Sequence, residues 1–451
     1  MQKRLLVVLL LIVTYRILAH IPIPLAEGAQ LRQIIDNLFS SQQLLGFFDL
    51  LSGGALSSLS IMLMGLGPYI NASIIMQLLT KAIPKLEELQ KDGEMGRRKI
   101  NQWTRMIAVP LAIIQSIGLL ILIQQTAGAQ AGIDLAASTS IFQWVLMVAT
   151  LTGGSVLLMW LGELITEQGI GNGISLLIFA GIISQLPSTG ATLVQTIAGA
   201  NQQLDVFGWF TLPISGKGLA ISSAIIAATL IVTYLVVKLN EAQRIIKVSY
   251  AKRVQGNRQY GGVGTILPIK LIIAGVIPVI FAVAFLSVPQ FVGQLLQNSS
   301  TPWMTELGQN LTIWFAQPET QQTPVNDPFN IYIYPIFYFL LVMLFTYFYT
   351  SVVFNAKEIA ENLQKQGGFI DKVRPGTQTE AYLKKIVSRL NLFGATSLGL
   401  LALLPLFAER ILGTSQLTLG GTGLLIVVSV ALETLRQLES RALMVTYDQD
   451  Y

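Results

Sequence analysis

The chain has 451 residues, of which 52% are hydrophobic and only 12% are charged, with a formal net charge of +5. Soluble domains carry about 25% charged residues, so the composition excludes an ordinary soluble protein and indicates one that lies mostly within a membrane. The chain has no cysteine and one histidine, His20, which excludes disulfide frameworks, thiolate sites, histidine-based zinc sites and catalytic triads. We therefore expect no enzyme, no metal site and no cofactor.

Apolar stretches of about 20 residues, the length that crosses a bilayer as a helix, recur along the chain. The predicted spans are 5–21, 60–80, 106–124, 142–162, 172–190, 219–237, 268–292, 331–354, 391–408 and 418–437. The first span leads into Pro22 and Pro24 rather than into a small-residue cleavage site, so we interpret it as a retained helix and not as a signal peptide. The predicted fold is all-α, a polytopic membrane protein with ten transmembrane helices.

The segment between the first two spans, residues 47–60, reads FFDLLSGGALSSLS. It is too polar and too rich in small residues to cross a bilayer. Non-spanning backbone is tolerated at membrane depth only where protein or a water-filled cavity surrounds it. The segment therefore predicts a short re-entrant helix, and an amphipathic helix at the membrane surface is the alternative.

Most of the lysines and arginines cluster in three segments, 81–105, 238–270 and 355–389, and at the two ends of the chain. Positively charged loops stay in the cytoplasm during membrane insertion. We therefore expect both termini and all three segments to be cytoplasmic, which agrees with an even number of spans.

Ten helices with both ends on one side divide into two groups of five that point in opposite directions. We predict an N-terminal half, 1–190, with helices one to five, and a C-terminal half, 191–451, with helices six to ten and cytoplasmic loops at about 238–268 and 355–389. Inverted repeats of this kind place a transport pathway between the halves. The two halves share no clear sequence identity, so this symmetry follows from topology alone.

Charged residues inside the predicted spans are rare. Arg16, Glu163 and Glu433 lie near helix ends, where we interpret them as interfacial. An ion-coupled carrier places charges near the midplane of the membrane, so a proton or sodium site is poorly supported. An ion-coupled secondary solute transporter nevertheless remains an alternative, as does a membrane scaffold or insertase without a pore.

Seven stretches, in chain order, resemble the SecY family, the channel-forming subunit of the general protein translocase. They are FDLLSGGALSSLSIMLMGLGPYINASIIMQLL, KDGEMGRRKINQWTR, MWLGELITEQGIGNGISLLIFAGI, YAKRVQGNRQYGGVGTILPIK, AGVIPVIFA, EIAENLQKQGGFIDKVRPGTQTEAYL and GGTGLLIVVSVALETLRQ. The resemblance extends from residue 5 to about 448. It implies a channel that passes unfolded secretory polypeptides across the membrane and releases membrane segments laterally into lipid.

In this family, a short helix called the plug blocks the resting channel from outside, and a ring of aliphatic side chains closes around the translocating chain. The resemblance gives the plug role to segment 47–60, with Phe48, Leu51, Ser52, Gly53, Gly54 and Leu56. The matching motifs give an aliphatic ring of Leu66, Ile70, Ile174, Ile178, Ile280 and Ile426. Such a ring excludes water and ions and has no hydrogen-bonding preference for its substrate.

The family's lateral gate lies between the second and seventh spans, with the third and eighth alongside. The candidate gate residues are Asn71, Gln115, Ser116 and Ile272, the last standing where many bacterial relatives have asparagine. The resemblance also implies that the cytoplasmic loops dock the SecA motor ATPase or the ribosome. The candidate docking residues are Lys252, Arg253, Arg258 and Arg374.

The remaining implied partners are SecE-like and SecG-like small membrane subunits, membrane lipids, and the secretory and membrane polypeptides that are the substrates. The implied location is the bacterial cytoplasmic membrane, with a plastid membrane as the weaker alternative. The stretch GIGNG, residues 169–173, resembles a phosphate-binding loop, but it stands between two predicted membrane helices and lacks a following Gly-Lys-Ser. We interpret it as a tight turn.

Overall fold

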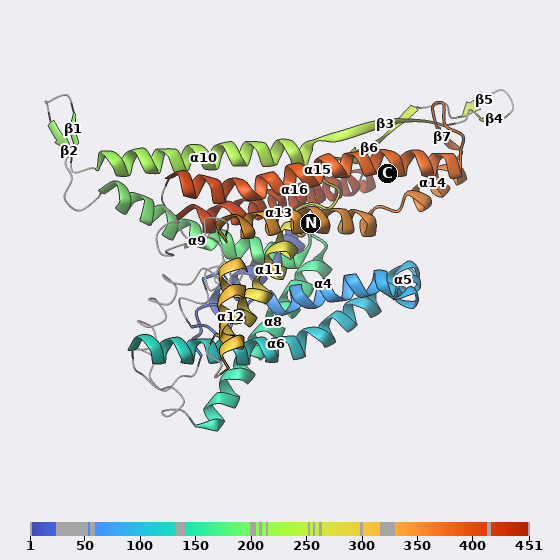
Figure 1. Cartoon of the computed structure of the whole chain (residues 1–451). Coiled ribbons are helices and arrows are strands. Elements are labelled where there is room, and N and C mark those ends of the chain that lie inside the picture. The colour runs from blue at the N-terminus through green and yellow to red at the C-terminus, as the bar shows by residue number, and fades with distance from the viewer. Residues whose placement is uncertain are drawn as a thin grey trace.

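The computed structural model describes most of the chain, and each predicted span contains a helix (Figure 1). The described residues are 2–23, 53–54, 59–131, 140–198, 204–206, 210–212, 215–250, 253–255, 258–260, 264–297, 301–315, 330–412 and 416–449. The ten helices are α1 (Gln2–Leu18), α4 (Gly67–Ala82), α6 (Glu94–Ala131), α8 (Ile141–Gln168), α9 (Gly173–Ala198), α10 (Gly216–Glu241), α11 (Ile277–Leu296), α13 (Asn330–Val353), α15 (Thr377–Leu412) and α16 (Gln416–Gln449). Within the described residues, seven helices are long and apolar enough to cross a membrane by these two criteria alone.

Two of the predicted spans begin later than expected. Residues 61–66 form turns, and α4 starts only at Gly67 instead of at residue 60. The seventh span was predicted at 268–292, but its first residues belong to a strand and α11 starts at Ile277. The helix α9 continues to Ala198, so the predicted division between the halves at 190 falls inside a helix.

The same local motif, a glycine followed three residues later by a proline, begins both α4 and α11. The two stretches are GLGPYI, 65–70, and GVIPVI, 275–280. Gly65 and Gly275 have φ of 55° and 62°, a left-handed conformation that glycine adopts without steric cost. Pro68 and Pro278 then occupy the first helical turn, where the missing N–H has no helical partner to lose. Each stretch therefore turns the chain sharply and begins a helix in the same way.

A small three-stranded antiparallel sheet that the sequence did not predict accompanies the helices. The strands are β3 (Gln243–Tyr250), β6 (Gly264–Lys270) and β7 (Gly368–Ile370), in the order β6-β3-β7. Ile246 pairs with Leu267, and Val248 lies between Thr265 and Ile370. Alternate residues of β3 are buried against α15, because a strand presents every second side chain to the same face. Two short hairpins complete the strands: β1 (Leu204–Val206) with β2 (Phe210–Leu212), and β4 (Arg253–Gln255) with β5 (Arg258–Tyr260).

Three shorter helices were not predicted. They are α5 (Pro84–Lys91), α12 (Pro302–Phe315) and α14 (Ala356–Lys365). The helix α12 packs closely on the end of α11, because Gly293 and Gly308 face each other without side chains between the two backbones. Gln297 strengthens this contact by donating to the hydroxyl of Thr312 at 2.8 Å.

The three basic segments lie at one end of the molecule, and the β1–β2 hairpin lies at the other (Figure 1). The basic end carries α5, the β3–β6 hairpin and α14, at the right of the view. Between the two ends, the largest cluster of buried hydrophobic residues draws side chains from the predicted N-terminal and C-terminal halves alike. The core is therefore shared by the two halves.

Two arginines of α16 bind the ends of other helices, and Arg441 thereby joins the C-terminal half to the N-terminal half. Arg441 donates to the carbonyl oxygen of Gln168 at 3.4 Å, at the end of α8, and Arg436 donates to that of Asn240 at 3.3 Å, near the end of α10. Cations suit these positions because the final carbonyl groups of a helix carry partial negative charge. Burial lowers the pKa of Lys270 at the end of β6, and the nearby positive charge of Arg436 lowers it further. The negative charge of Glu433 opposes part of this shift.

Candidate functional site

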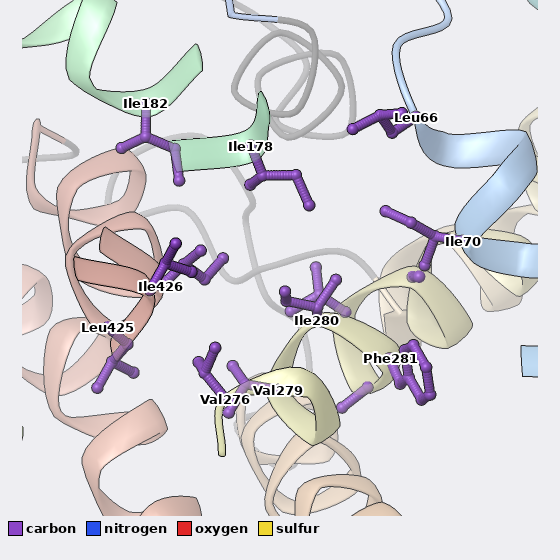
Figure 2. Packing of buried hydrophobic residues seen from close by; sticks show 14 of the residues in the cluster. Leu66, Ile70, Ile178, Ile182, Val276, Val279, Ile280, Phe281, Leu425 and Ile426 are labelled. Carbon is purple, nitrogen blue, oxygen red and sulfur yellow. The ribbon is translucent and has the colours of Figure 1, made fainter. Parts of the chain in front are cut away.

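The aliphatic side chains that the motifs assign to a ring lie in the centre of the main core. Leu66, Ile70, Ile178, Ile280 and Ile426 are each at most 5% exposed and belong to one cluster. Figure 2 shows them directed toward a common centre from α4, α9, α11 and α16. These helices belong to both predicted halves of the chain, so the ring lies where the halves meet.

One member of the predicted ring is only partly buried at the edge of the main cluster, and one neighbour was missed. Ile174 is partly buried and lies against α8, where a β-carbon built on Gly162 would be 3.1 Å from its Cγ1. Ile182 is 7% exposed, belongs to the main cluster and lies beside Ile178 (Figure 2). The spacing of four residues from 174 to 178 to 182 places all three on one helical face, which was the available signal.

The two helix starts position the ring. Leu66 is the N-cap residue of α4 and Ile70 lies in its first turn. Ile280 lies in the first turn of α11, after the N-cap residue Val276. Neither N-cap side chain forms a capping hydrogen bond. The turns at Gly65 and Gly275 therefore place two uncapped helix N-termini at the ring.

Of the six named plug residues, Gly53 and Gly54 lie within the described residues, and Phe48, Leu51, Ser52 and Leu56 lie outside them. Gly53 and Gly54 have φ of 70° and 82°, so they form a turn and not a helical stretch. The carbonyl oxygen of Gly53 accepts hydrogen bonds from Arg16 Nη1 and, at 3.3 Å, from Ser184 Oγ. The turn is thus held between α1 and α9.

Three of the four predicted gate residues lie on α4 and α6. Asn71 is partly buried on α4, and the Oε1 atom of Gln115 and the Oγ atom of Ser116 on α6 are buried without a hydrogen-bond partner among the described residues. Both helices contact α11. Ile272 lies apart from them, in the turn before α11, where it lines a small pocket with residues of α10, α15 and α16 such as Asn240.

At the contact between α6 and α11, an aromatic side chain of α11 fills the space beside a glycine of α6. Gly118 of α6 lies under the ring of Phe291 of α11, so that a β-carbon at 118 would come within 2.8 Å of the Cε1 atom of Phe291. Gly118 is buried. The absence of a side chain at 118 is therefore what lets the two helices approach. Sequence reasoning missed this pair, although the glycine stands two residues after the predicted gate residue Ser116.

The predicted docking residues come from two segments that the sheet brings together. The strands β4 and β5 place Arg253 and Arg258 in one short hairpin, in which Gln255 pairs with Arg258; Lys252 lies outside the described residues. Arg374 is exposed in the turn after β7, and its carbonyl oxygen accepts a hydrogen bond from Thr379 Oγ1 at 2.9 Å. Because β7 pairs with β3, the two loops extend from one sheet.

The described residues contain no group of three or more His, Asp or Glu side chains placed to hold a metal ion. Ion pairs inside the spans are few in the same part of the chain. Arg105 Nε of α6 lies 2.9 Å from Glu163 Oε1 of α8, which gives Glu163 a structural partner. The arrangement is thus dominated by apolar packing and contacts between helices.

Comparisons with known proteins agree with this geometry. A family model named SecY matches residues 60–435. The protein translocase subunit SecY of Streptomyces galbus is 40% identical over 454 residues, which cover 99% of this chain and 96% of that protein. The corresponding subunit of Mycobacterium tuberculosis is 38% identical over 454 residues, with the same coverage.

Solved structures show the same fold. One, described as a protein-conducting channel, matches 95% of this chain and 91% of its own with a TM-score of 0.65 at 21% identity. A second, of a SecY protein whose plug domain stabilises the closed state of the translocation channel, matches 95% and 90% with a TM-score of 0.62 at 21% identity. A third, the idle yeast Ssh1 complex bound to the 80S ribosome, matches 84% and 80% with a TM-score of 0.53 at 16% identity.

Proposed function

The chain belongs to the SecY family of protein translocase subunits and forms a protein-conducting channel in a bacterial membrane, and on this premise we propose that its aliphatic ring is the constriction of that channel. The observation that carries the proposal is the convergence of buried aliphatic side chains from α4, α9, α11 and α16 at one point (Figure 2). Ile182 joins the ring on the same grounds, and Ile174 occupies its edge.

Apolar side chains suit a constriction that must seal and yet accept any sequence. They exclude water and ions from the resting pore by dewetting, and they offer no hydrogen bonds that would retain a passing polypeptide. The family membership sets aside the ion-coupled solute transporter and the scaffold without a pore, which composition alone left open.

The remaining assignments complete this proposal. Segment 47–60 is the plug, and the contact of α4 and α6 with α11 is the lateral gate through which membrane segments leave for the lipid. The chain crosses the membrane ten times, with both termini and the three basic segments in the cytoplasm. Because α9 crosses residue 190, the division between the halves follows Ala198.

The channel performs no chemistry of its own in this proposal, so the energy comes from partners. The SecA motor and the ribosome dock on the loops that carry Arg253, Arg258 and Arg374, and SecE-like and SecG-like subunits cover the membrane-facing helices. The common sheet β6-β3-β7 supports this, because it makes one surface from the two loops.

Asparagine substitutions in the ring test the constriction. In Ile280→Asn and Ile426→Asn, an amide enters an aliphatic cluster, where an unpaired polar group costs about 1–3 kcal/mol. The cost is relieved when the pore opens and hydrates, so the open fraction rises by roughly 5- to 150-fold. We expect both variants to export more of a reporter whose signal peptide has a shortened apolar core.

The matched control is Leu151→Asn, because Leu151 is equally buried but belongs to a separate cluster that includes α6 and α8 residues. It should lose thermal stability without a gain in export. Equal or lower export by the two ring variants at equal expression would show that Ile280 and Ile426 are ordinary core residues.

A further inference from the structure

Arg16 has a binding partner that the sequence does not reveal. It lies in the last turn of α1, a helix in which most outward residues are apolar and exposed, such as Leu10, Val13 and Ile17. A cation in such a helix is expensive and is kept where it has a partner. Within the described residues that partner is no carboxylate but the carbonyl oxygen of Gly53.

The same carbonyl group has a second donor on another helix. The single hydroxyl proton of Ser184 on α9 is shared between the Gly53 oxygen, 3.3 Å from Oγ, and the carbonyl oxygen of Gly181, 2.6 Å from Oγ. One backbone oxygen is thus held by α1 from one side and by α9 from the other. Hydrogen bonds from a charged donor are about twice as strong as neutral ones, so the hydrogen bond from Arg16 is stronger than the one from Ser184.

The backbone of Gly53 also fits a notch in α9. A β-carbon at Gly181 would lie 3.1 Å from Gly53 Cα and 3.2 Å from the hydroxyl oxygen of Tyr15, so the two glycines allow backbone to meet backbone. Gly53 itself has φ of 70°, which a residue with a side chain adopts only with strain. Position, conformation and hydrogen bonding all fix this one turn.

We propose that Arg16 is a positioning residue of the channel: together with the Gly181 notch it latches the plug at Gly53 and sets how readily the resting channel opens. The proposal rests on the assignment of segment 47–60 as the plug. The acceptor is a backbone carbonyl and carries no net charge, so water can replace it when the vestibule hydrates. An ion pair with a carboxylate would hold more tightly and release less easily.

The notch also links the latch to the ring. Gly181 and Ser184 lie on the same helix as Ile178 and Ile182, within two turns. A displacement of α9 that widens the ring therefore moves the surface on which Gly53 rests. Opening of the constriction and release of the plug are coupled through this one helix.

The test is an Arg16→Gln variant, with Arg16→Lys as the conservative variant. Resting ion current in planar bilayers and export of a reporter with a weakened signal peptide are measured in the complete chain and in a chain lacking 47–60. Loss of one hydrogen bond to a charged donor should raise the open fraction about ten- to a hundred-fold in the complete chain. Arg16→Lys should fall between the parent and Arg16→Gln.

In the chain lacking the plug, Arg16→Gln should add nothing, because its target is gone. Gly181→Ala should imitate Arg16→Gln, whereas Gly190→Ala on the same helix, where a β-carbon meets nothing within 4 Å, should resemble the parent. Thr14→Ala removes an exposed hydroxyl of α1 and controls for damage to that helix.

The failures are distinguishable. If Arg16→Gln raises the current equally with and without the plug, or leaves it unchanged where deletion of 47–60 raises it, the latch is overturned and the proposed channel stands. If deletion of 47–60 itself leaves the current unchanged, the plug assignment fails and the latch fails with it.

Discussion

Gly118 illustrates how one missing side chain sets a contact between helices. Its backbone lies directly under the ring of Phe291, at the proposed lateral gate. A side chain at 118 would separate α6 from α11, and the buried polar atoms of Gln115 and Ser116 nearby would then reach water. The packing at this one residue thus opposes the hydration that favours an open gate.

We expect Gly118→Ala to destabilise the closed gate by about 1–3 kcal/mol, the usual effect of overpacking. The variant should export a reporter with a weakened signal peptide more efficiently than the parent. Adding Phe291→Leu shortens the opposing side chain and should return export to the parental level. Gly153→Ala on α8, where a β-carbon meets nothing within 4 Å, is the control. Additive effects of the two substitutions would contradict a direct contact.

A motif fixes the helical position of a single residue, whereas tertiary contacts that no motif encodes decide what that residue packs against. Five of the six ring residues lie together in the core because the motifs fix their place in a helix. Ile174 and Ile182 share that helical face, but Ile182 is buried in the main cluster, whereas Ile174 is partly buried and contacts both that cluster and Gly162. Arg16 was interpreted as interfacial, because nothing local shows that a residue 37 positions away supplies its acceptor.

Among the elements, the helices followed from apolar length and the strands were missed. The long spans are visible because about 20 apolar residues form a signal that no other element produces. The strand β3, QRIIKVSY, alternates only partly and is stabilised by its pairing with β6 and β7, the latter more than a hundred residues later in the chain. Strand propensity depends on such neighbours more than helix propensity does. The basic segment 238–270, which we predicted as a loop, therefore forms two strands of the sheet.

The sheet gives the basic loops a fixed geometry, and Arg374 tests it. Because Arg374 is exposed beyond β7, Arg374→Glu should leave folding and membrane insertion unchanged. It should reduce motor-driven export at least tenfold, because a guanidinium group can pair with a carboxylate through two hydrogen bonds and a carboxylate cannot. Export is measured in inverted membrane vesicles with a purified motor and ATP.

The control for this prediction is Lys384→Glu, an equal change of charge at an exposed position on the neighbouring helix α15. If both variants lose export equally, the effect comes from net charge at the surface. If Arg374→Glu exports normally, Arg374 is not a docking residue.

At the scale of the whole molecule, the structure reveals a relation between the halves that the sequence comparison overlooked. GLGPYI and GVIPVI start the second helix of the first predicted half and the second helix of the other half. Each combines a left-handed glycine, a first-turn proline and an isoleucine directed into the ring. Six residues are too few to register as identity between halves, yet they place Ile70 and Ile280 in equivalent positions around the proposed constriction.

The two uncapped helix starts also give the proposed constriction an electric field. The first N–H groups of a helix carry about half a positive charge in sum, and both α4 and α11 begin beside the ring residues without a side-chain cap. An aliphatic pore has no charges of its own, so these dipoles set its polarity. They repel protons and sodium ions, whose leakage would dissipate the membrane potential, and they attract the carbonyl oxygens of a passing peptide. We therefore expect the current through Ile280→Asn channels in a potassium chloride gradient to reverse near the equilibrium potential of chloride; reversal near that of potassium would show that the helix starts do not govern the pore.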